Sequence, residues 1–543
     1  MSNPPSTLTT AEALAQGMKR AGISAVFGIP GVHNMHLYEA LRRLGDIRLV
    51  VSRHEQGAGY MADGYARTTG GIGVALVVTG PGATNILTPV AVAHADSSPV
   101  LVVASQVERR YLGQERGLMH EFRDQMGAFT SHTAWSYRLM DPADAQWCLR
   151  RAFERLQAER PRPVYLEIPL DVLHGQGATP PRPLTPIHRP GPDPAAVAAI
   201  AERLRQAERP VLLAGIGVVR AGGELALRAV AEALGAPVLT TVQARGALPS
   251  QHPLHLGSYW TREIFRDSIL NEADAVLAVG TRLSARTWVS GRLPLPPALF
   301  QVDLDAAEIG RSVDLERGVV ADARLFLEAL AAQLQGLNHG GREWALEAVR
   351  RHRQRVEAGL AERLGSVYPY FLALREALPS HGILATETSG FGIWLAKYFP
   401  CDLPRRFLYP MASGTLGFAL PAAVGAAVAE PSTPVVALAG DGGILFNVGE
   451  LATARGEGLN LITVVFNDGG YGTVRMSQRQ AFSGQTVGVD LWTPDFVKLG
   501  ESFGIPAEVV DTAEDFHAAL QKAIASGGPH LIEVIQPEMP SPF

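Results

Sequence analysis

The sequence predicts an α/β protein built from three doubly wound parallel-sheet domains. Short apolar, β-branched runs alternate with helical segments along the whole chain, which is the pattern of parallel sheets covered by helices. The chain has 543 residues, and at about 150 residues per domain it can hold three or four such units. Hydrophobic residues make up 47% and charged residues 19% of the chain, as in ordinary globular proteins, which excludes a disordered polymer.

Two changes in composition separate the predicted domains. One is a stretch rich in proline and glycine without hydrophobic periodicity, as in a linker, and the other is a polar stretch followed by a charged helical segment. We therefore predict an N-terminal domain over residues 1–174, a linker over 175–193, a central domain over 194–335, a linker helix over 336–365 and a C-terminal domain over 366–543.

The first domain is expected to begin with a helix over 11–21. Thr9 and Glu12 can form a capping box before it, and Gly22 is a stop signal after it. The strands of this domain are expected over 25–27, 48–52, 73–79, 100–105 and 164–168.

The two later domains show the same alternation. In the central domain we expect helices over 194–207 and 323–334, and strands over 211–214, 238–241, 275–279 and 299–302. The linker helix is expected over 343–363. In the C-terminal domain we expect strands over 383–386, 435–439, 461–466 and 531–535, with a helix over 444–455 between the second and third.

Charge and targeting signals exclude several other classes. The net charge is −5, with no block of like charge, so a nucleic-acid or membrane surface has no electrostatic support. Cys148 and Cys401 cannot by themselves form a disulfide framework or a zinc site. The N-terminus has no signal-peptide pattern. Gly and Pro interrupt the uncharged stretches 71–93 and 407–429, which favours strand–turn–helix units over membrane spans. We expect a soluble, cytoplasmic protein.

The strongest chemical signal lies in the C-terminal domain. Gly440, Asp441, Gly442 and Gly443 follow one predicted strand, and residues 467–469 follow the next. A helical crossover between them makes the two strands parallel, so both turns lie at one rim of the sheet, where α/β proteins bind ligands. Oxygen donors and open backbone amides suit Mg²⁺ and a diphosphate. The alternative is a pair of ordinary βα turns, but the doubled pattern favours a metal–diphosphate site.

These turns carry a family resemblance. Asp441 between glycines, followed by Asn467 and Asp468, resembles the thiamine diphosphate signature GDG…N(N/D). Segments 28–31, 53–57, 61–67 and 79–85 resemble the pyrimidine-binding domain of the same superfamily, and segments 235–241 and 252–257 its central domain. The chain is similar to the acetolactate synthase-like group of 2-oxo acid decarboxylases and carboligases over almost its whole length.

The resemblance implies roles for individual residues. Glu55 would bind the aminopyrimidine ring and activate the cofactor, although a solvated carboxylate at a helix start is the usual state of such a residue. Asp441 and Asn467 would bind Mg²⁺ through their side chains and Gly469 through its carbonyl. Leu416 would be the apolar wedge under the cofactor, or plain core, and Gly414 would accept a hydrogen bond from the cofactor's amine. Further cofactor contacts would come from Pro30, Gly31, Gly390, Gly392, Gly440, Gly442, Gly443, Tyr471 and Gly472.

The implied activity is thiamine diphosphate- and Mg²⁺-dependent decarboxylation of a 2-oxo acid through an enamine, giving an aldehyde or a carboligation product. The resemblance also implies a homodimer or homotetramer with sites between subunits. The alternatives are an acetolactate synthase-type or aldehyde-lyase-type carboligase, a non-catalytic homologue, and a nicotinamide or flavin oxidoreductase based on Gly215 and Gly217.

Several departures argue against acetolactate synthesis and FAD binding. Trp135, Ser477 and the Gly390–Gly392 turn stand where acetolactate synthases have other residues, and segment 280–286 replaces their FAD-contacting segment. FAD thus stays open but doubtful. Segments 28–34, 118–125 and 161–171 look closer to the guanidino-oxopentanoate (2-ketoarginine) decarboxylase branch.

Polar residues in first-domain loops are candidates for proton transfer. His33, His120 and Gln106 are the catalytic candidates, because a histidine near neutral pH can donate a proton, although most histidines are surface or satisfied core groups. Glu121 or Asp124 would suit a guanidinium-bearing substrate, but ordinary solvated charge is the preferred interpretation. The sequence leaves open the 2-oxo acid, the acceptor, the proton donor and the choice between dimer and tetramer.

Overall fold

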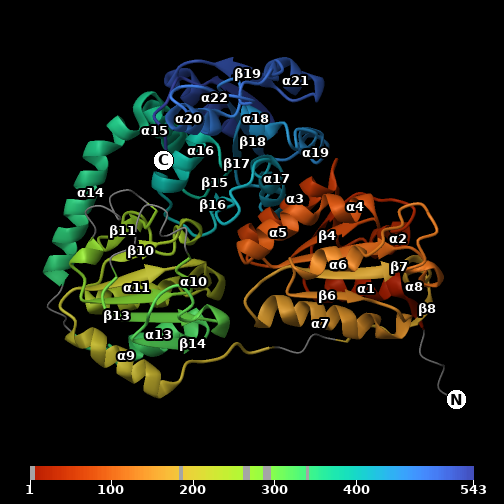
Figure 1. The fold of residues 1–543 in the computed structure, drawn as a ribbon, viewed down its shortest axis with the longest axis horizontal. Helices are drawn as coiled ribbons and strands as arrows, with labels where there is room; N and C mark the ends of the chain where they lie inside the picture. The colour runs from red at the N-terminus through yellow and green to blue at the C-terminus, as the bar shows by residue number, and fades with distance from the viewer. Residues whose placement is uncertain (1–6, 183–186, 261–268, 285–294, 338–341, 543) are drawn as a thin grey trace.

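The computed structural model describes residues 7–182, 187–260, 269–284, 295–337 and 342–542. These residues form three six-stranded parallel sheets, each covered by helices (Figure 1). A short antiparallel pair joins β1 (Leu8–Thr9) to β8 (Gln176–Ala178). The three-domain α/β class predicted from the sequence is confirmed.

The first sheet has the strand order β3-β2-β4-β5-β7-β6. Its strands are β2 (Ala25–Gly28), β3 (Arg48–Val51), β4 (Gly73–Val77), β5 (Val100–Gln106), β6 (Trp135–Arg138) and β7 (Val164–Pro169). Its helices are α1 (Thr10–Arg20), α2 (Met35–Leu44), α3 (Glu55–Thr69), α4 (Pro81–Asn85), α5 (Leu87–Ala95), α6 (Gln125–Thr130), α7 (Ala145–Ala158) and α8 (Leu170–Leu173). The capping box at α1 is present, since Thr9 and Glu12 exchange side chain-to-backbone hydrogen bonds.

The central sheet has the order β11-β10-β9-β12-β13-β14. Its strands are β9 (Pro210–Ala214), β10 (Val238–Thr240), β11 (His255–Ser258), β12 (Ala275–Val279), β13 (Ala298–Asp303) and β14 (Arg317–Val320). The helices that cover it are α9 (Pro194–Gln206), α10 (Ile216–Ala221), α11 (Glu224–Leu234) and α13 (Ala323–Gln333). The long helix α14 (Arg342–Leu364) leads along the outside of the molecule to α15 (Tyr368–Ala377) (Figure 1).

The third sheet has the order β16-β15-β17-β18-β20-β19. Its strands are β15 (Ile383–Thr386), β16 (Phe407–Leu408), β17 (Val435–Gly440), β18 (Leu461–Asn467), β19 (Ala507–Val510) and β20 (His530–Ile535). Its helices are α16 (Gly390–Tyr398), α17 (Ala419–Ala429), α18 (Asp441–Ile444), α19 (Glu450–Gly456), α20 (Gly472–Ala481), α21 (Phe496–Ser502) and α22 (Ala513–Ser526).

Three local expectations were wrong. The helix expected over 444–455 is divided into α18 and α19, and β8 lies inside the stretch expected to be a linker. The short strand β1 was missed as well, and so were five strands of the six-stranded sheets: β6, β11, β14, β16 and β19. All five are edge strands of their sheets. An edge strand is short and partly exposed, so it lacks the continuous apolar run of a central parallel strand.

The first and third sheets are joined by direct contact between α3 and α17 (Figure 1). A Cβ added at Gly64 would lie 2.1 Å from the carbonyl oxygen of Ala422, and one added at Gly425 would lie 2.0 Å from that of Met61. Only glycine permits this approach of the two backbones. Side chains of both helices belong to one buried core that spans the two sheets.

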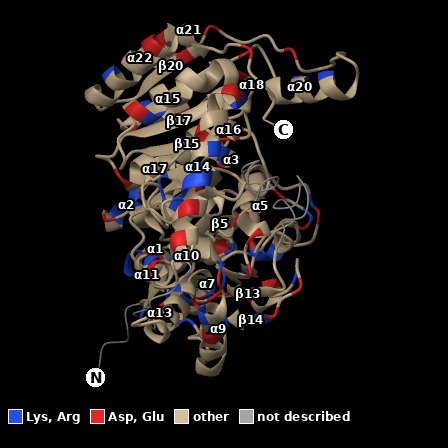
Figure 2. Ribbon diagram, turned by 90° about the vertical axis from the view of Figure 1, so that its left-hand side faces the viewer, with Lys and Arg blue, Asp and Glu red and all other residues tan. Residues whose placement is uncertain are grey.

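Charged side chains of both signs are interspersed along the chain (Figure 2). Cys148 and Cys401 are buried and not bonded to each other. Among the described residues, no helix is long and apolar enough to cross a membrane.

Candidate functional site

A cavity of about 400 Å³ lies at the carboxyl rim of the third sheet. The first residues of α16, α18 and α20 line it, so three helix N-termini face one space. Backbone amides at helix starts are unpaired and carry partial positive charge, which favours an anion with several oxygens. Predicted contacts that line this cavity are Gly390, Gly414, Leu416, Gly440, Asp441, Gly442, Gly443, Tyr471 and Gly472.

Asp441 is the buried acid of this cavity. The residue comes directly after β17 and is 1% exposed. Its Oδ2 atom has no hydrogen-bond partner among the described residues. Burial, and then the charge of Asp468, raise the pKa of Asp441 to about 6. A buried oxygen without a partner, facing a second carboxylate, is a place where a cation would restore the lost interactions.

Asp468, which the sequence analysis did not assign as a ligand, faces the same cavity. Its backbone amide lies 3.4 Å from Asp441 Oδ1, and burial raises the pKa of its carboxyl. Asn467 and Gly469 do not line the cavity. The Asn467 side chain donates to Glu533 Oε1 at 2.8 Å and accepts from the Gly469 amide at 3.0 Å. Asn467 is the last residue of β18, so Asp468 is the first residue beyond the strand end.

Among the described residues, no group of three or more His, Cys, Asp or Glu side chains is placed to hold a metal ion. The two aspartates therefore cannot complete a protein-only cage. Mg²⁺ is usually bound by one or two carboxylates together with water and substrate phosphates. The donor set of this cavity, two carboxylates beside helix N-termini, fits Mg²⁺ held together with a diphosphate.

Glu387 is a further buried acid of the cavity that sequence reasoning missed. It follows β15, and its Oε2 accepts a hydrogen bond of 3.3 Å from the amide of Ala419, the first residue of α17. Burial raises the pKa of Glu387 to about 7. A Cβ at Gly443 would lie 1.7 Å from Glu387 Oε1, so the glycine is required here by close approach. Gly392, also predicted as a contact, does not line the cavity, and its amide donates to Ser389 Oγ.

Leu416 and Gly414 are carried by the loop that precedes α17. Leu416 is half-buried and reaches the cavity wall. Tyr60 on α3 contacts this loop through a hydrogen bond of 3.2 Å between its hydroxyl and Thr415 Oγ1, and Asn447 Nδ2 donates to Gly417 O at 2.7 Å. The loop is therefore held from both the first and the third sheet.

Glu55 lies at the rim of the first sheet and is the first residue of α3. It is 9% exposed, and its Oε2 accepts a hydrogen bond of 2.9 Å from Asn85 Nδ2. A Cβ at Gly82 would lie 3.2 Å from Glu55 Oε1, so the first turn of α4 covers the carboxylate. Glu55 is thus a buried group and not a solvated helix-start carboxylate. The nearby Tyr38 hydroxyl is buried without a partner, and burial, followed by the charge of Glu55, raises its pKa.

Glu450 on α19 fixes the start of α3. Its Oε1 accepts hydrogen bonds from the amides of Arg53 at 3.0 Å and His54 at 3.1 Å, and Thr453 Oγ1 also donates to the carboxylate. The residue is 1% exposed, and burial raises its pKa. The Glu450 carboxylate, from the third sheet, therefore positions the backbone directly before Glu55, in the first sheet.

His33 and His120 lie side by side, with ring centroids 5.0 Å apart. Burial, and then the charge of His120, lower the pKa of His33. His120 has a left-handed backbone with φ of 66°, and its Nδ1 lies 3.1 Å from the carbonyl oxygen of Thr79. Pro30 is exposed and Gly31 half-buried in the loop that carries His33.

Gln106 is 2% exposed and belongs to a buried polar network. Its amide oxygen accepts from Thr79 and from the Val107 amide, and its amide nitrogen donates to Glu167. Gln125 joins the same network and accepts from the amide of Gly80 at 2.7 Å. Because both polar atoms of Gln106 are occupied, the geometry favours a role in shaping the loop at Gly80.

Glu121 and Asp124 have local backbone partners. Glu121 accepts from the Leu118 amide at 3.0 Å, and Asp124 caps α6 through the Gly127 amide at 2.9 Å. Both carboxylates therefore stabilise the turn in which they lie.

Gly215 and Gly217 have a packing role. A Cβ at Gly215 would lie 2.1 Å from Gly280 O, and the Gly217 amide donates to that same oxygen at 3.1 Å. The amide of Gly217 is thus not free to bind a pyrophosphate. Part of segment 280–286, on which the FAD expectation rests, lies outside the described residues.

Within one chain, Glu55 and the other first-sheet candidates lie apart from the cavity beside Asp441. Among the described residues, neither Glu55 nor any other first-sheet candidate lines the cavity beside Asp441. The structure thus brings the predicted residues together as two groups on two sheets.

Comparison with known proteins gives matches along the whole chain. Three family models match in order: the thiamine pyrophosphate enzyme N-terminal TPP binding domain over residues 8–128, the central domain over 197–330 and the C-terminal TPP binding domain over 387–534. A probable 2-ketoarginine decarboxylase of Pseudomonas aeruginosa is 37% identical, over 98% of this chain and 94% of its own. A probable acetolactate synthase large subunit of Methanocaldococcus jannaschii is 32% identical, over 97% and 91%. A chloroplastic acetolactate synthase of Zea mays is 32% identical, over 97% and 85%.

Proposed function

This chain belongs to the thiamine pyrophosphate enzyme family, of the acetolactate synthase and 2-oxo acid decarboxylase type, and on that premise we propose that it is a Mg²⁺-dependent decarboxylase of a 2-oxo acid. The observation that carries the proposal is the juxtaposition of Asp441 and Asp468 with three helix N-termini around one cavity. When bound, thiamine diphosphate supplies the electron sink that decarboxylation requires and that no side chain offers.

In this proposal the cavity residues hold the diphosphate end of the cofactor. The amides at the starts of α16, α18 and α20 bind the phosphate oxygens, and Asp441 binds Mg²⁺. Asp468 takes the place of Asn467 as the second side-chain ligand, because Asp468 faces the cavity and Asn467 is turned to Glu533. Leu416 supports the middle of the cofactor.

Glu55 is proposed to bind the pyrimidine end and to hold the proton that activates the cofactor. Its burial and its hydrogen bond to Asn85 support this assignment, because a buried carboxylate holds a fixed direction and a strong interaction with its partner. His33 and His120 lie at the same rim and are proposed to exchange the proton with the reacting carbon or its oxygen.

The two groups are proposed to form complete sites between subunits of a homodimer or homotetramer. Glu55 does not line the cavity beside Asp441 in its own chain, so each group needs a partner from another copy. Large apolar side chains are exposed near both groups, which supports burial of these faces. They are Val32, Met35, Met119, Phe122, Phe446, Val474, Phe482, Val487 and Trp492.

The substrate is proposed to be a 2-oxo acid. Decarboxylation to an aldehyde is proposed as the main activity, in preference to acetolactate synthesis. The similarity to the probable 2-ketoarginine decarboxylase supports this preference. Trp135 and Ser477 support it too, because they stand where acetolactate synthases have other residues. FAD stays a minor alternative, to be tested by the absorbance of the purified protein.

The experiment is product analysis by mass spectrometry with thiamine diphosphate and Mg²⁺. Pyruvate and branched, aromatic and guanidino 2-oxo acids are each supplied with and without an acceptor aldehyde. We expect an aldehyde one carbon shorter from at least one acid, and no product from Asp441→Ala. Acetolactate as the main product from pyruvate would contradict the decarboxylase assignment, and no turnover of any acid would favour a non-catalytic homologue.

A further inference from the structure

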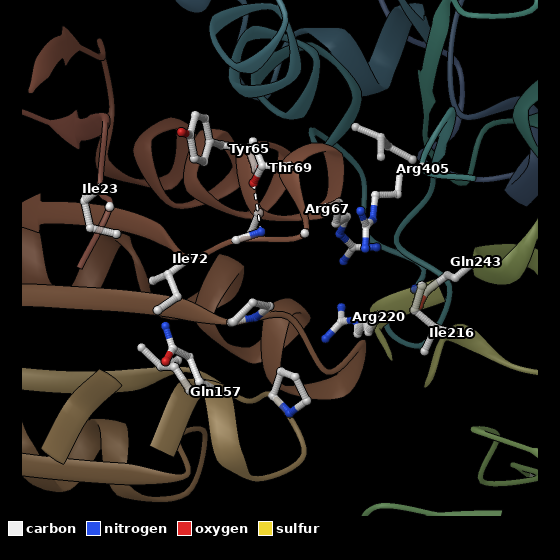
Figure 3. Close-up of a pocket in the computed structure, with 18 of the residues that line it drawn as sticks. Ile23, Tyr65, Arg67, Thr69, Ile72, Gln157, Ile216, Arg220, Gln243 and Arg405 are labelled. Atoms are coloured by element: carbon white, nitrogen blue, oxygen red, sulfur yellow. Dashed lines mark hydrogen bonds between the residues drawn. The ribbon is translucent and has the colours of Figure 1, made fainter. Parts of the chain in front are cut away.

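A second cavity, of about 270 Å³, lies where the three sheets and their helices meet. We call it the arginine cavity, because Arg67, Arg189, Arg220 and Arg405 line it. They come from α3, from the segment before α9, from α10 and from the loop before β16. The described residues that line it include no aspartate or glutamate. Figure 3 shows the guanidinium groups of Arg67, Arg220 and Arg405 pointing into the same space.

Two of the four arginines are neutralised outside the cavity. Arg67 pairs with Asp63 at 2.8 Å and with Asp96 at 2.9 Å. Arg189 pairs with Asp322 at 3.2 Å. These ion pairs hold the cavity wall in place, and Arg220 and Arg405 are the two lining arginines that have no ion pair among the described residues.

Arg220 has no carboxylate partner among the described residues. Its Nη1 atom is buried without any hydrogen-bond partner, and Nη2 lies 3.4 Å from Ser98 Oγ. Arg405 donates to the carbonyl oxygen of Val219 at 2.8 Å and has no ion pair in the described part of the chain. Burial, and then the charge of Arg67, lower the pKa of Arg220 to about 9. The charges of Asp63 and Asp96 act in the opposite direction but do not reach Arg220 as an ion pair. A buried guanidinium with an unpaired N–H group is costly, so a group that accepts from it will bind favourably.

The lining and the volume of the cavity fit a small oxyanion. A guanidinium offers paired N–H donors in a planar fork that matches the oxygens of a phosphate group. The volume is below the roughly 300 Å³ at which sites for larger organic ligands begin. Ile23 and Ile72 form an apolar wall (Figure 3). A short carbon chain attached to the anion would pack against this wall.

We propose that the arginine cavity binds a phosphate group, either as inorganic phosphate or as a small phosphate monoester, through Arg220 and Arg405. The anion would connect the central sheet, through α10, with the third sheet, through the loop before β16. Its binding therefore stabilises the junction of the three sheets. This proposal concerns a site apart from Asp441 and does not depend on the reaction catalysed there.

The test is a calorimetric titration and a thermal melt of the full chain saturated with thiamine diphosphate and Mg²⁺, so that the cavity beside Asp441 is filled. The probes are inorganic phosphate and glycerol phosphate, with chloride at the same ionic strength as reference. We expect saturable binding of at least one probe and a melting temperature that rises with its concentration. Equal responses to phosphate and chloride would overturn the proposal.

Arg220→Met separates ligand binding from a structural role. We expect at least a tenfold weaker phosphate response, and a melting temperature without phosphate that is unchanged or higher, because the variant removes a buried charge that has no ion pair with a described residue. The matched control is Arg228→Met on α11, whose side chain is 54% exposed and pairs with Glu232. It should keep the phosphate response.

Two results would contradict the assignment. One is full phosphate binding by Arg220→Met, and the other is a lower melting temperature of that variant without phosphate together with unchanged binding. Should Arg220→Met not fold, Arg220→Lys keeps the charge but loses the planar fork, and we expect a folded protein with weaker phosphate binding. The comparison of variants holds with or without cofactor loading, so it is independent of the proposed function.

Discussion

The carboxylate of Glu450 accepts a hydrogen bond of 3.1 Å from the amide of His54, the residue directly before Glu55. The two residues are 396 positions apart in the sequence. The contact positions the first turn of α3 from the third sheet, so the direction of the Glu55 side chain depends on a residue that does not touch the cofactor in our proposal.

Glu450→Ala should therefore affect both stability and activity. The amides of Arg53 and His54 lose their acceptor, which costs about 1–3 kcal/mol for a buried unsatisfied group. We expect a lower midpoint of chemical unfolding and a lower kcat at unchanged substrate KM. Glu457→Ala on the same side of the junction, which removes an ion pair with the partly exposed Arg48, is the control and should cost less than about 1 kcal/mol.

Glu55→Gln should keep the fold and the cofactor but lose turnover. The amide has the shape of the carboxyl group, so Asn85 retains a partner, but it cannot hold the activating proton. We expect kcat to fall by about 10²–10⁴-fold, the usual contribution of a general acid or base, with thiamine diphosphate still retained on gel filtration. Full activity would remove Glu55 from the mechanism.

Asp441→Ala and Asp468→Ala should both abolish Mg²⁺-dependent retention of thiamine diphosphate, measured by cofactor assay after gel filtration. Asn467→Ala should retain more cofactor than Asp468→Ala, because the Asn467 side chain is bonded to Glu533 and not to the cavity. The reverse order would return the ligand role to Asn467, the residue implied by the family resemblance.

The effect of Mg²⁺ on stability should increase with pH. The pKa of Asp441 is raised from 3.8 to about 6, so between these values the unfolded chain ionises more readily than the folded one. Without metal, stability contributed by this group is present at low pH and is lost as pH rises through 6. Mg²⁺ binds the ionised form. With thiamine diphosphate present, the Mg²⁺-induced rise in melting temperature should thus be larger at pH 7.5 than at pH 5.5; an equal rise would contradict the assignment.

Gly64→Ala should separate α3 from α17. The added Cβ would lie 2.1 Å from a backbone carbonyl, which cannot rotate away, so we expect a loss of about 1–3 kcal/mol or more. Gly456→Ala is the matched control, because a Cβ there meets nothing within 4 Å in α19. The control should be neutral or slightly stabilising, and equal losses in both variants, seen by chemical unfolding, would argue against the close contact.

Much of the fold was predictable because central parallel strands are continuous apolar runs. β15 was predicted with its observed bounds, and β12 likewise. Edge strands such as β6 and β19 lack that run and were missed. In the site, the turn over 440–443 after one strand and the turn over 467–469 after the next together indicated the sheet rim at which the cavity lies. The orientation of Asn467, the burial of Tyr38 and the contact between Glu450 and His54 depend on tertiary packing, which spacing along the chain does not encode.

The glycine contact between α3 and α17 also limits how the protein can move. With the two backbones touching and their side chains in one core, moving the first and third sheets apart at this junction would expose buried apolar surface. We therefore expect the short loops above the strand ends to control the entry of a substrate, so that substitutions that stiffen those loops slow catalysis before they change the framework below.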